Sequence, residues 1–203
     1  MNIQNPMIIH GFSKNIQVAK SLLDNGFYLS FGKYLLRNQD LENVFKFVPE
    51  NRIFLETDTI DETIFEVYQK AAQIKNLKIL IAEDDEVSSE LLSAIVSEIS
   101  HEILIAKNGN EAVEICSNNP DIDLVLMDID MPGNQDGIGA AQIISDRFDI
   151  PIIFVTANAE DSVFARALKT SPYGYVLKPI SKDLVRTVIE MGYSRSLLDI
   201  QLK

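Results

Sequence analysis

Short apolar runs alternate with amphipathic stretches along the chain. The apolar runs are bounded by turn residues, which predicts strands. Between them, apolar residues recur at helical spacing, as in the series Val87, Leu91, Ile95 and Ile99. We place the strands at residues 7–10, 27–31, 52–56, 78–82, 102–106, 123–128, 151–156 and 175–177. Strict alternation of strands and helices predicts an α/β fold, with parallel strands joined by right-handed crossovers.

The alternation divides into three strand–helix units before residue 76 and five after it. Most of the net charge of −12 falls in the second part, and such a shift in charge marks a compositional boundary. We therefore predict two domains, residues 1–76 and residues 77–203, the second ending in a helix.

Composition and charge narrow the class of function. A hydrophobic content of 46% is enough for a proper core. The acidic net charge argues against nucleic acid as a ligand, because phosphate contacts need a basic face. No apolar run could cross a bilayer and the N-terminus lacks signal-peptide features, so we expect no membrane partner. A single cysteine, Cys116, excludes an internal disulfide and predicts a cytoplasmic protein with Cys116 in its core.

Polar side chains stand where four strands of the second segment end. Glu83 and Asp84 follow the first strand, Asp128 and Thr156 end the third and fourth, and Lys178 follows the fifth. The carboxyl ends of parallel strands share one edge, where ligands bind. Crowded carboxylates favour a hard cation such as Mg²⁺. A lysine and a hydroxyl suit a phosphoryl oxygen, and a carboxylate can accept a phosphoryl group covalently.

Each of these residues also has a purely structural interpretation. Asp128 suits the start of the turn that Met131 and Pro132 complete. Thr156 suits a helix cap, and Lys178 suits an ion pair. If all of these interpretations were true, complementary polar groups would stand at four strand ends by coincidence. We therefore favour a phosphoryl- and metal-binding site.

Residues 77–195 resemble a response-regulator receiver domain of the chemotaxis-regulator type. The motifs that carry the resemblance are residues 79–85 (ILIAEDD), 126–132 (LMDIDMP), 154–157 (FVTA) and 175–179 (YVLKP). The resemblance implies a doubly wound five-stranded parallel sheet of order 2-1-3-4-5. It also implies phosphorelay signalling, with Mg²⁺ as cofactor and a histidine kinase or phosphotransfer protein as phosphodonor; a homodimer is left open.

The resemblance assigns the metal and phosphoryl chemistry to four residues. Asp128 is the phosphoacceptor and a metal ligand. Glu83 and Asp84 are the acid pair, and the backbone carbonyl of Asp130 completes the metal site. The Asp130 side chain departs from the family pattern by adding a further carboxylate beside the site.

The resemblance assigns the switch to two residues and phosphoryl binding to a third. Thr156 supplies the switch hydroxyl, Tyr175 is the aromatic rotor, and Lys178 binds the phosphoryl group. The peptide bond between Lys178 and Pro179 is expected to be cis.

Residues 1–76 resemble the C-terminal part of TatD-type metal-dependent hydrolases, which are TIM barrels. The matching stretches are residues 8–12 (IIHGF) and 54–58 (FLETD). His10 and Asp58 match a metal ligand and a metal-site residue of that family. The other ligand-bearing strands, including a His-x-His pair, are missing, so we expect a vestigial metal site and no enzyme.

Two alternative functions and one alternative architecture remain open. The chain could be a metal-dependent hydrolase using His10 and Asp58. It could also be an engineered or recombined chimera without a biological role, because residues 77–131 resemble receivers of hybrid sensor kinases and the chain from Gly133 resembles another branch. Finally, three units plus five could close into one (β/α)₈-like barrel; we favour a receiver with an N-terminal extension.

Overall fold

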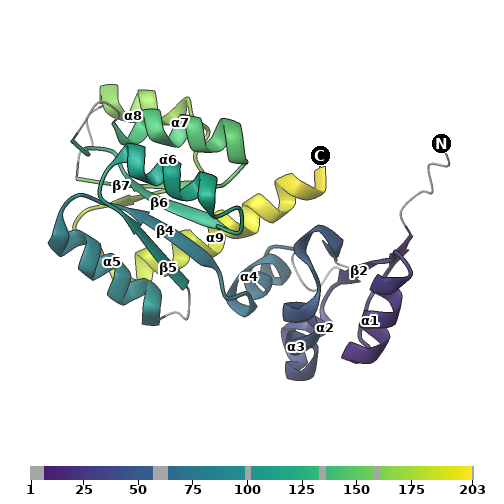
Figure 1. Cartoon of the computed structure of the whole chain (residues 1–203). Coiled ribbons are helices and arrows are strands. Elements are labelled where there is room, and N and C mark those ends of the chain that lie inside the picture. Colours follow the sequence, from purple (N-terminus) through teal and green to yellow (C-terminus); the bar gives the residue numbers. More distant parts are fainter. Residues whose placement is uncertain (1–6, 57–63, 99–101, 133–135, 158–160, 203) are drawn as a thin grey trace, which may run out of the picture. The chain divides into compact units, whose positions relative to one another are not determined.

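The structure is a computed structural model that describes residues 7–56, 64–98, 102–132, 136–157 and 161–202. It contains two compact units, one of Met1–Lys75 with Leu197–Lys203 and one of Asn76–Ser196 (Figure 1). The described strands form two separate sheets, one of three strands and one of five. The alternative of a single eight-unit barrel is therefore wrong.

The larger unit holds a five-stranded parallel sheet of order β5-β4-β6-β7-β8. This is the predicted order 2-1-3-4-5. The strands are β4 (Lys78–Ala82), β5 (Glu102–Ala106), β6 (Leu124–Asp128), β7 (Ile152–Thr156) and β8 (Gly174–Leu177). All residues of β6 and β7 are buried, as expected for central strands covered on both faces. Because β4 pairs with β6, the residues that follow these two strands come out side by side.

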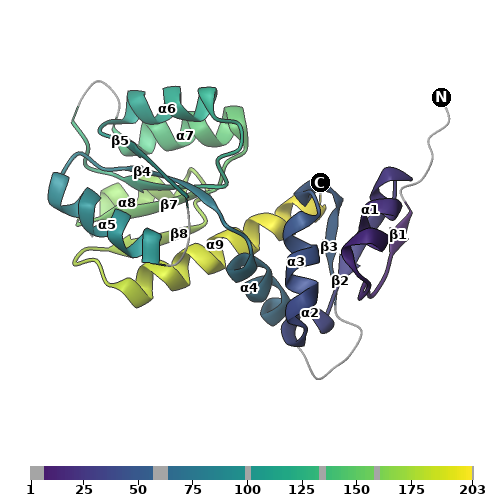
Figure 2. The same ribbon diagram turned by 60° about the horizontal axis from the view of Figure 1, so that its bottom comes forward.

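Helices cover both faces of this sheet (Figures 1 and 2). One face carries α5 (Glu86–Glu98) and α9 (Lys182–Leu202). The other carries α6 (Gly109–Asn118), α7 (Gly137–Phe148) and α8 (Asp161–Leu168), which contribute to one apolar cluster with the sheet. Cys116 lies in that cluster and is 1% exposed, in line with its expected core position. None of the helices in the described part of the chain has both the length and the hydropathy of a membrane span.

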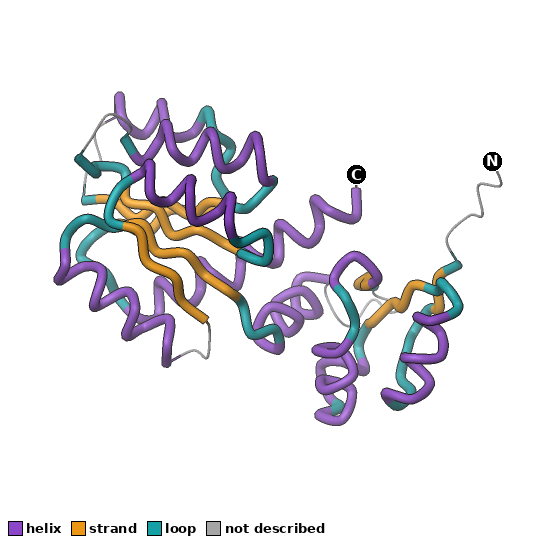
Figure 3. The backbone as a smooth tube through the Cα atoms, viewed as in Figure 1, coloured by secondary structure: helices purple, strands orange, loops and turns teal. Residues whose placement is uncertain are grey.

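The smaller unit holds a three-stranded parallel sheet of order β1-β2-β3 (Figure 3). Its strands are β1 (Ile8–Ile9), β2 (Tyr28–Phe31) and β3 (Ile53–Leu55). The other elements are α1 (Ile16–Asp24), α2 (Tyr34–Arg37), α3 (Gln39–Phe47), the 3₁₀ helix η1 (Glu50–Arg52) and α4 (Ile64–Ile74). Strands that are consecutive in sequence are also neighbours in this sheet, as in a barrel, whereas β4 separates β5 from β6 in the larger unit.

The smaller unit differs from expectation in two places. β1 is shorter than the predicted strand because Gly11 adopts a left-handed conformation with φ 58°, which turns the chain out of the sheet. The short helix α2 was not predicted, since a single turn offers too little sequence for a helical period to appear.

The core of the smaller unit contains packed aromatic rings. The Phe31 ring meets the Phe12 and Phe45 rings edge to face, with ring centroids 5.6 and 5.1 Å apart.

Candidate functional site

The carboxyl edge of the five-stranded sheet gathers the acidic residues that the sequence placed there. Glu83, Asp84 and Asp128 each offer one carboxylate oxygen, and these atoms lie within 4.8 Å of one another. Glu83 is 2% exposed and Asp128 is 5% exposed, whereas Asp84 is open to solvent. The cluster thus has two buried carboxylates and one at its mouth.

Lys178 reaches across from the end of β8 to this cluster. Its Nζ donates to Asp128 Oδ2 at 2.8 Å and to Glu83 Oε1 at 3.0 Å. Its backbone N–H donates to the Thr156 carbonyl, and its peptide bond to Pro179 is cis, as expected. The ammonium group therefore faces both buried carboxylates.

The pKa values reflect this crowding. Burial raises the pKa of Glu83 to about 7, with Lys178 lowering it and Asp128 raising it further. Burial alone would lower the pKa of Lys178, but hydrogen bonds to Asp128 and Glu83 outweigh it and raise that pKa. One ammonium group is thus shared between two carboxylates. Glu83 therefore keeps its proton at pH values well above those at which a glutamate usually loses it.

The donor set fits a hard divalent cation. Glu83 Oε2 is buried and accepts no well-formed hydrogen bond from the described residues. It still lies 2.9 Å from Lys178 Nζ. The Lys178 ammonium thus lies beside both oxygens of Glu83 and has hydrogen-bond geometry toward Oε1. A buried carboxylate oxygen in this condition, beside two further carboxylates, suits a cation that prefers oxygen ligands.

Asp130 sits at the margin of the cluster. Its backbone N–H donates to Asp128 Oδ1 at 3.0 Å, which holds the phosphoacceptor candidate in place. Its own side chain is exposed and is not among the three grouped carboxylates. The main chain of Asp130, rather than its carboxylate, is therefore the part that belongs to the site.

Thr156 and Tyr175 lie where the sequence placed them, at the end of β7 and within β8. Thr156 is 2% exposed. The Tyr175 ring lies 5.7 Å from the Phe154 ring and 4.9 Å from that of Phe164. Its hydroxyl is buried without a hydrogen-bond partner among the described residues, and burial raises its pKa. A buried hydroxyl without a hydrogen-bond partner costs free energy in this position of the ring.

The predicted pairing of His10 with Asp58 is not described, because Asp58 lies outside the described residues. Instead, His10 Nδ1 lies 2.6 Å from Glu56 Oε2. Ser30 Oγ donates to the same oxygen and the Gly11 N–H donates to Glu56 Oε1, both at 2.5 Å. Sequence reasoning missed Glu56 and Ser30, although Glu56 stands at the end of a predicted strand.

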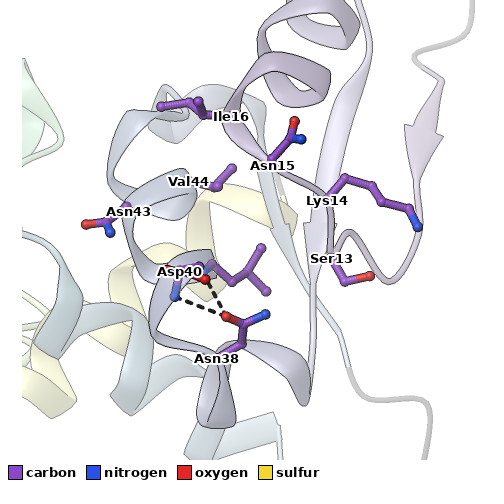
Figure 4. A pocket seen from close by; sticks show the side chains of 9 residues that line it. Ser13, Lys14, Asn15, Ile16, Asn38, Asp40, Asn43 and Val44 are labelled. Carbon is purple, nitrogen blue, oxygen red and sulfur yellow. Dashed lines mark hydrogen bonds between the residues drawn. The ribbon is translucent and has the colours of Figure 1, made fainter.

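A pocket of about 390 Å³ in the smaller unit was also missed (Figure 4). It lies beside the first turns of α1 and α3. Asn38 Oδ1 accepts from the Asp40 and Leu41 N–H groups, and Asn15 caps α1 in the same way. Asparagine before an amphipathic stretch was the available signal, but it predicts helix starts and not a ligand.

Comparison with known proteins gives two family matches. The response regulator receiver domain model matches residues 79–190, and the TatD related DNase model matches residues 2–104. The second match thus continues beyond the predicted segment of residues 1–76, through β4 and α5 into β5.

Curated relatives match the larger unit. The uncharacterized transcriptional regulatory protein YrkP of Bacillus subtilis is 35% identical over 106 residues, which is 52% of this chain and 45% of YrkP. The transcriptional regulatory protein PdtaR of Mycobacterium tuberculosis is 36% identical over 120 residues, 58% of this chain and 57% of PdtaR. The chain thus spans about half the length of these regulators.

Solved receiver domains share the fold. The signal receiver domain of a modulated diguanylate cyclase from Desulfovibrio desulfuricans is 30% identical, with a TM-score of 0.57 over 60% of this chain and 97% of that one. The N-terminal domain of a response regulator/sensory box/GGDEF protein from Carboxydothermus hydrogenoformans is 32% identical, with a TM-score of 0.56 over 62% and 99%. The chain therefore belongs to the response regulator receiver domain family, and it carries a TatD related DNase segment in its N-terminal half.

Proposed function

We propose that this chain is the phosphoacceptor of a two-component or phosphorelay system and that Asp128 takes the phosphoryl group. The observation that carries the proposal is the position of Lys178 Nζ, bonded to Asp128 and Glu83 at one sheet edge. A buried carboxylate with an ammonium group beside it, at an edge open through Asp84, is suited to bind an incoming phosphoryl group.

Glu83, Asp84 and Asp128 would hold Mg²⁺ through their carboxylates, together with the backbone carbonyl of Asp130. When bound, the ion supplies positive charge that offsets the phosphoryl oxygens and the crowded carboxylates. The Asp130 N–H, bonded to Asp128 Oδ1, orients the nucleophile. Lys178 compensates the carboxylate charge through its contacts with Asp128 and Glu83.

The transfer proceeds from a phosphohistidine of a histidine kinase or phosphotransfer protein. A carboxylate oxygen of Asp128 forms a bond to phosphorus as the phosphorus–nitrogen bond breaks. The imidazole keeps that electron pair and takes its proton from solvent, and Asp128 becomes an acyl phosphate. Lys178 then exchanges its contact with the Asp128 carboxylate for one with a phosphoryl oxygen.

The switch follows from the neighbours of Asp128 at the sheet edge. The Thr156 hydroxyl, one strand away, donates to a phosphoryl oxygen once that group is present. Movement of Thr156 opens room for the Tyr175 ring, whose hydroxyl lacks a hydrogen-bond partner among the described residues. Phosphorylation thereby shifts the population between two arrangements of the segment after β7.

Intact-mass measurement with Mg²⁺ and acetyl phosphate tests the proposal. The wild-type chain should gain one phosphoryl group, and Asp128→Asn should gain none. Asp130→Asn is the matched control, because it removes a neighbouring carboxylate outside the cluster and should still gain one. A phosphoryl group that persists on Asp128→Asn would overturn the assignment.

The TatD related match raises hydrolysis at a metal bound by His10 and Asp58 as a second candidate. The described contacts of His10 do not favour it, since His10 Nδ1 is engaged by Glu56. One histidine and one carboxylate leave a catalytic metal short of the usual three protein ligands. We assign this segment a structural role.

A further inference from the structure

Helix α8 is attached to the larger unit by few contacts. Among its residues with a described side-chain environment, only Ala167 is buried. Val163 packs partly against the core, and the Phe164 ring touches Tyr175. Helices with little buried apolar surface open locally at low free-energy cost, so single contacts have a large influence on their position.

An ion pair joins α8 to Asp136, the residue that directly precedes α7. Arg166 Nη2, in the last turn of α8, donates to Asp136 Oδ2 at 2.5 Å. The other carboxylate oxygen of Asp136 accepts from the Gly139 N–H at 2.8 Å and so caps α7. Asp136 is thus held in a defined position and presents its second oxygen to Arg166.

The residue after Asp136 touches the phosphoacceptor directly. A Cβ on Gly137 would lie 1.8 Å from the Asp128 carbonyl oxygen, so only glycine allows this approach. The Gly137 N–H also donates to the Ile129 carbonyl at 3.1 Å. The start of α7 is therefore packed directly on the main chain of Asp128, and Asp136 stands next to this contact in sequence.

We infer that Arg166 is a positioning residue of the switch, whose ion pair with Asp136 couples α8 to the backbone of Asp128. The inference rests on the proposed phosphorylation of Asp128 and adds the route by which α8 senses it. The ion pair weakens steeply with distance. A small displacement of Asp136 and Gly137 therefore changes how strongly Arg166 attaches α8.

The pair should add little to the overall stability of the larger unit, which separates the inference from a purely structural role. Its side chains are 58% and 39% exposed, and exposed ion pairs contribute little to folding. Burial alone would raise the pKa of Asp136, but the Gly139 N–H and Arg166 lower it, so the carboxylate stays charged near neutral pH.

Hydrogen exchange of Asp161–Leu168, measured on the full chain before and after treatment with acetyl phosphate and Mg²⁺, tests the inference. Intact mass is recorded on each sample. In the wild type, exchange in α8 should change upon phosphorylation. In Arg166→Ala, exchange before phosphorylation should rise about two- to fivefold, as expected for loss of an exposed ion pair. The change upon phosphorylation should fall to less than half.

Three further variants make the result specific to the pair. Asp136→Asn keeps a capping oxygen for α7 but loses the charge, and it should behave as Arg166→Ala does. The double variant should match either single variant, because both remove the same contact. Arg166→Lys should restore the response, and Arg186→Ala, which breaks the Arg186–Glu190 pair inside α9, should leave α8 unchanged.

The outcomes separate the inference from the proposed function. A chain that gains no phosphoryl group fails the proposed function and the inference with it. A wild type that gains the group, with an α8 response equal to that of Arg166→Ala, overturns the inference alone. Additive effects in the double variant also overturn it.

Discussion

Gly137 approaches the main chain of Asp128 so closely that an added Cβ would meet the Asp128 carbonyl oxygen at 1.8 Å. The obstacle is backbone and cannot rotate away. The first residue of α7 is therefore fixed by the strand that bears Asp128, and not by helix propensity.

We predict that Gly137→Ala destabilises the larger unit. Alanine normally favours a helix over glycine, but here overpacking should cost about 1–3 kcal/mol. Urea unfolding followed by circular dichroism measures the loss. Gln142→Ala, at an exposed position of α7, is the control and should change stability little. A Gly137→Ala variant as stable as the wild type would contradict the close approach.

The roles of metal binding and switching should separate in two variants. Asp84→Asn removes a ligand charge and should weaken Mg²⁺ binding by about tenfold or more. Thr156→Ala should leave Mg²⁺ affinity nearly unchanged but reduce the conformational response to phosphorylation. Titration calorimetry with Mg²⁺ measures the first effect, and hydrogen exchange with and without phosphodonor measures the second.

Asp85→Asn provides a matched control for the loss of charge. Asp85 lies next to Asp84, but its carboxylate caps α5 by accepting from the Ser88 N–H at 2.8 Å. Asparagine keeps that cap, and Asp85 is not among the three grouped carboxylates, so Mg²⁺ affinity should fall less than in Asp84→Asn. Loss of Mg²⁺ binding in Thr156→Ala would show that our division of roles is wrong.

Glu56 should make the stability of the smaller unit depend on pH. Burial alone would raise its pKa, but hydrogen bonds from Ser30, His10 and Gly11 lower it below the ordinary value of 4.5. A group with a lowered folded-state pKa stabilises the fold above its unfolded-state pKa. That contribution disappears as the pH falls through the folded-state pKa.

We therefore predict that Glu56→Gln destabilises the smaller unit at pH 7 and that the difference from the wild type narrows below pH 4.5. Unfolding by urea at a series of pH values measures both effects. Glu114→Gln, at an exposed site of the other unit, should show no such pattern. A difference that stays constant down to low pH would contradict the role of the charged carboxylate.

Parallel strands and the gathering of polar residues at one sheet edge could be predicted from local signals, whereas the strand order 2-1-3-4-5 came from the resemblance to receiver domains, because alternation alone also fits a barrel. Strict strand–helix alternation predicted parallel sheets, and the motifs around Asp128 and Lys178 stand directly at strand ends. The sequence did not predict the contacts between His10 and Glu56 or between Asp136 and Arg166. These pairs are 46 and 30 residues apart and follow no period, so only the folded chain brings them together. The length of β1 depended on the conformation of one residue, Gly11.

We predict that the chain does not hydrolyse phosphodiesters through His10. Two protein ligands hold a metal too loosely to activate water, and Glu56 already engages the His10 ring. Assays with a chromogenic phosphodiester and Mg²⁺, Mn²⁺ or Zn²⁺ should give the same background rate for the wild type and His10→Ala. Metal-dependent turnover that disappears in His10→Ala, but not in Asp128→Asn, would revive the hydrolase hypothesis.

The last prediction concerns the independence of the larger unit. Residues 76–196 contain the complete five-stranded sheet and helices on both of its faces. They also include the part of α9 in which Val185, Ile189 and Tyr193 are buried, whereas residues 197–203 group with the smaller unit. A fragment of residues 76–196 should therefore fold alone.

The fragment should unfold cooperatively and gain one phosphoryl group with acetyl phosphate and Mg²⁺, while its Asp128→Asn version gains none. Residues 1–75 should not fold alone, because a three-stranded parallel sheet buries too little surface and leaves its edges bare. Circular dichroism and intact mass decide both points. An unfolded 76–196 fragment would show that the receiver depends on the TatD related segment, and a folded 1–75 fragment would show that this segment is a domain of its own.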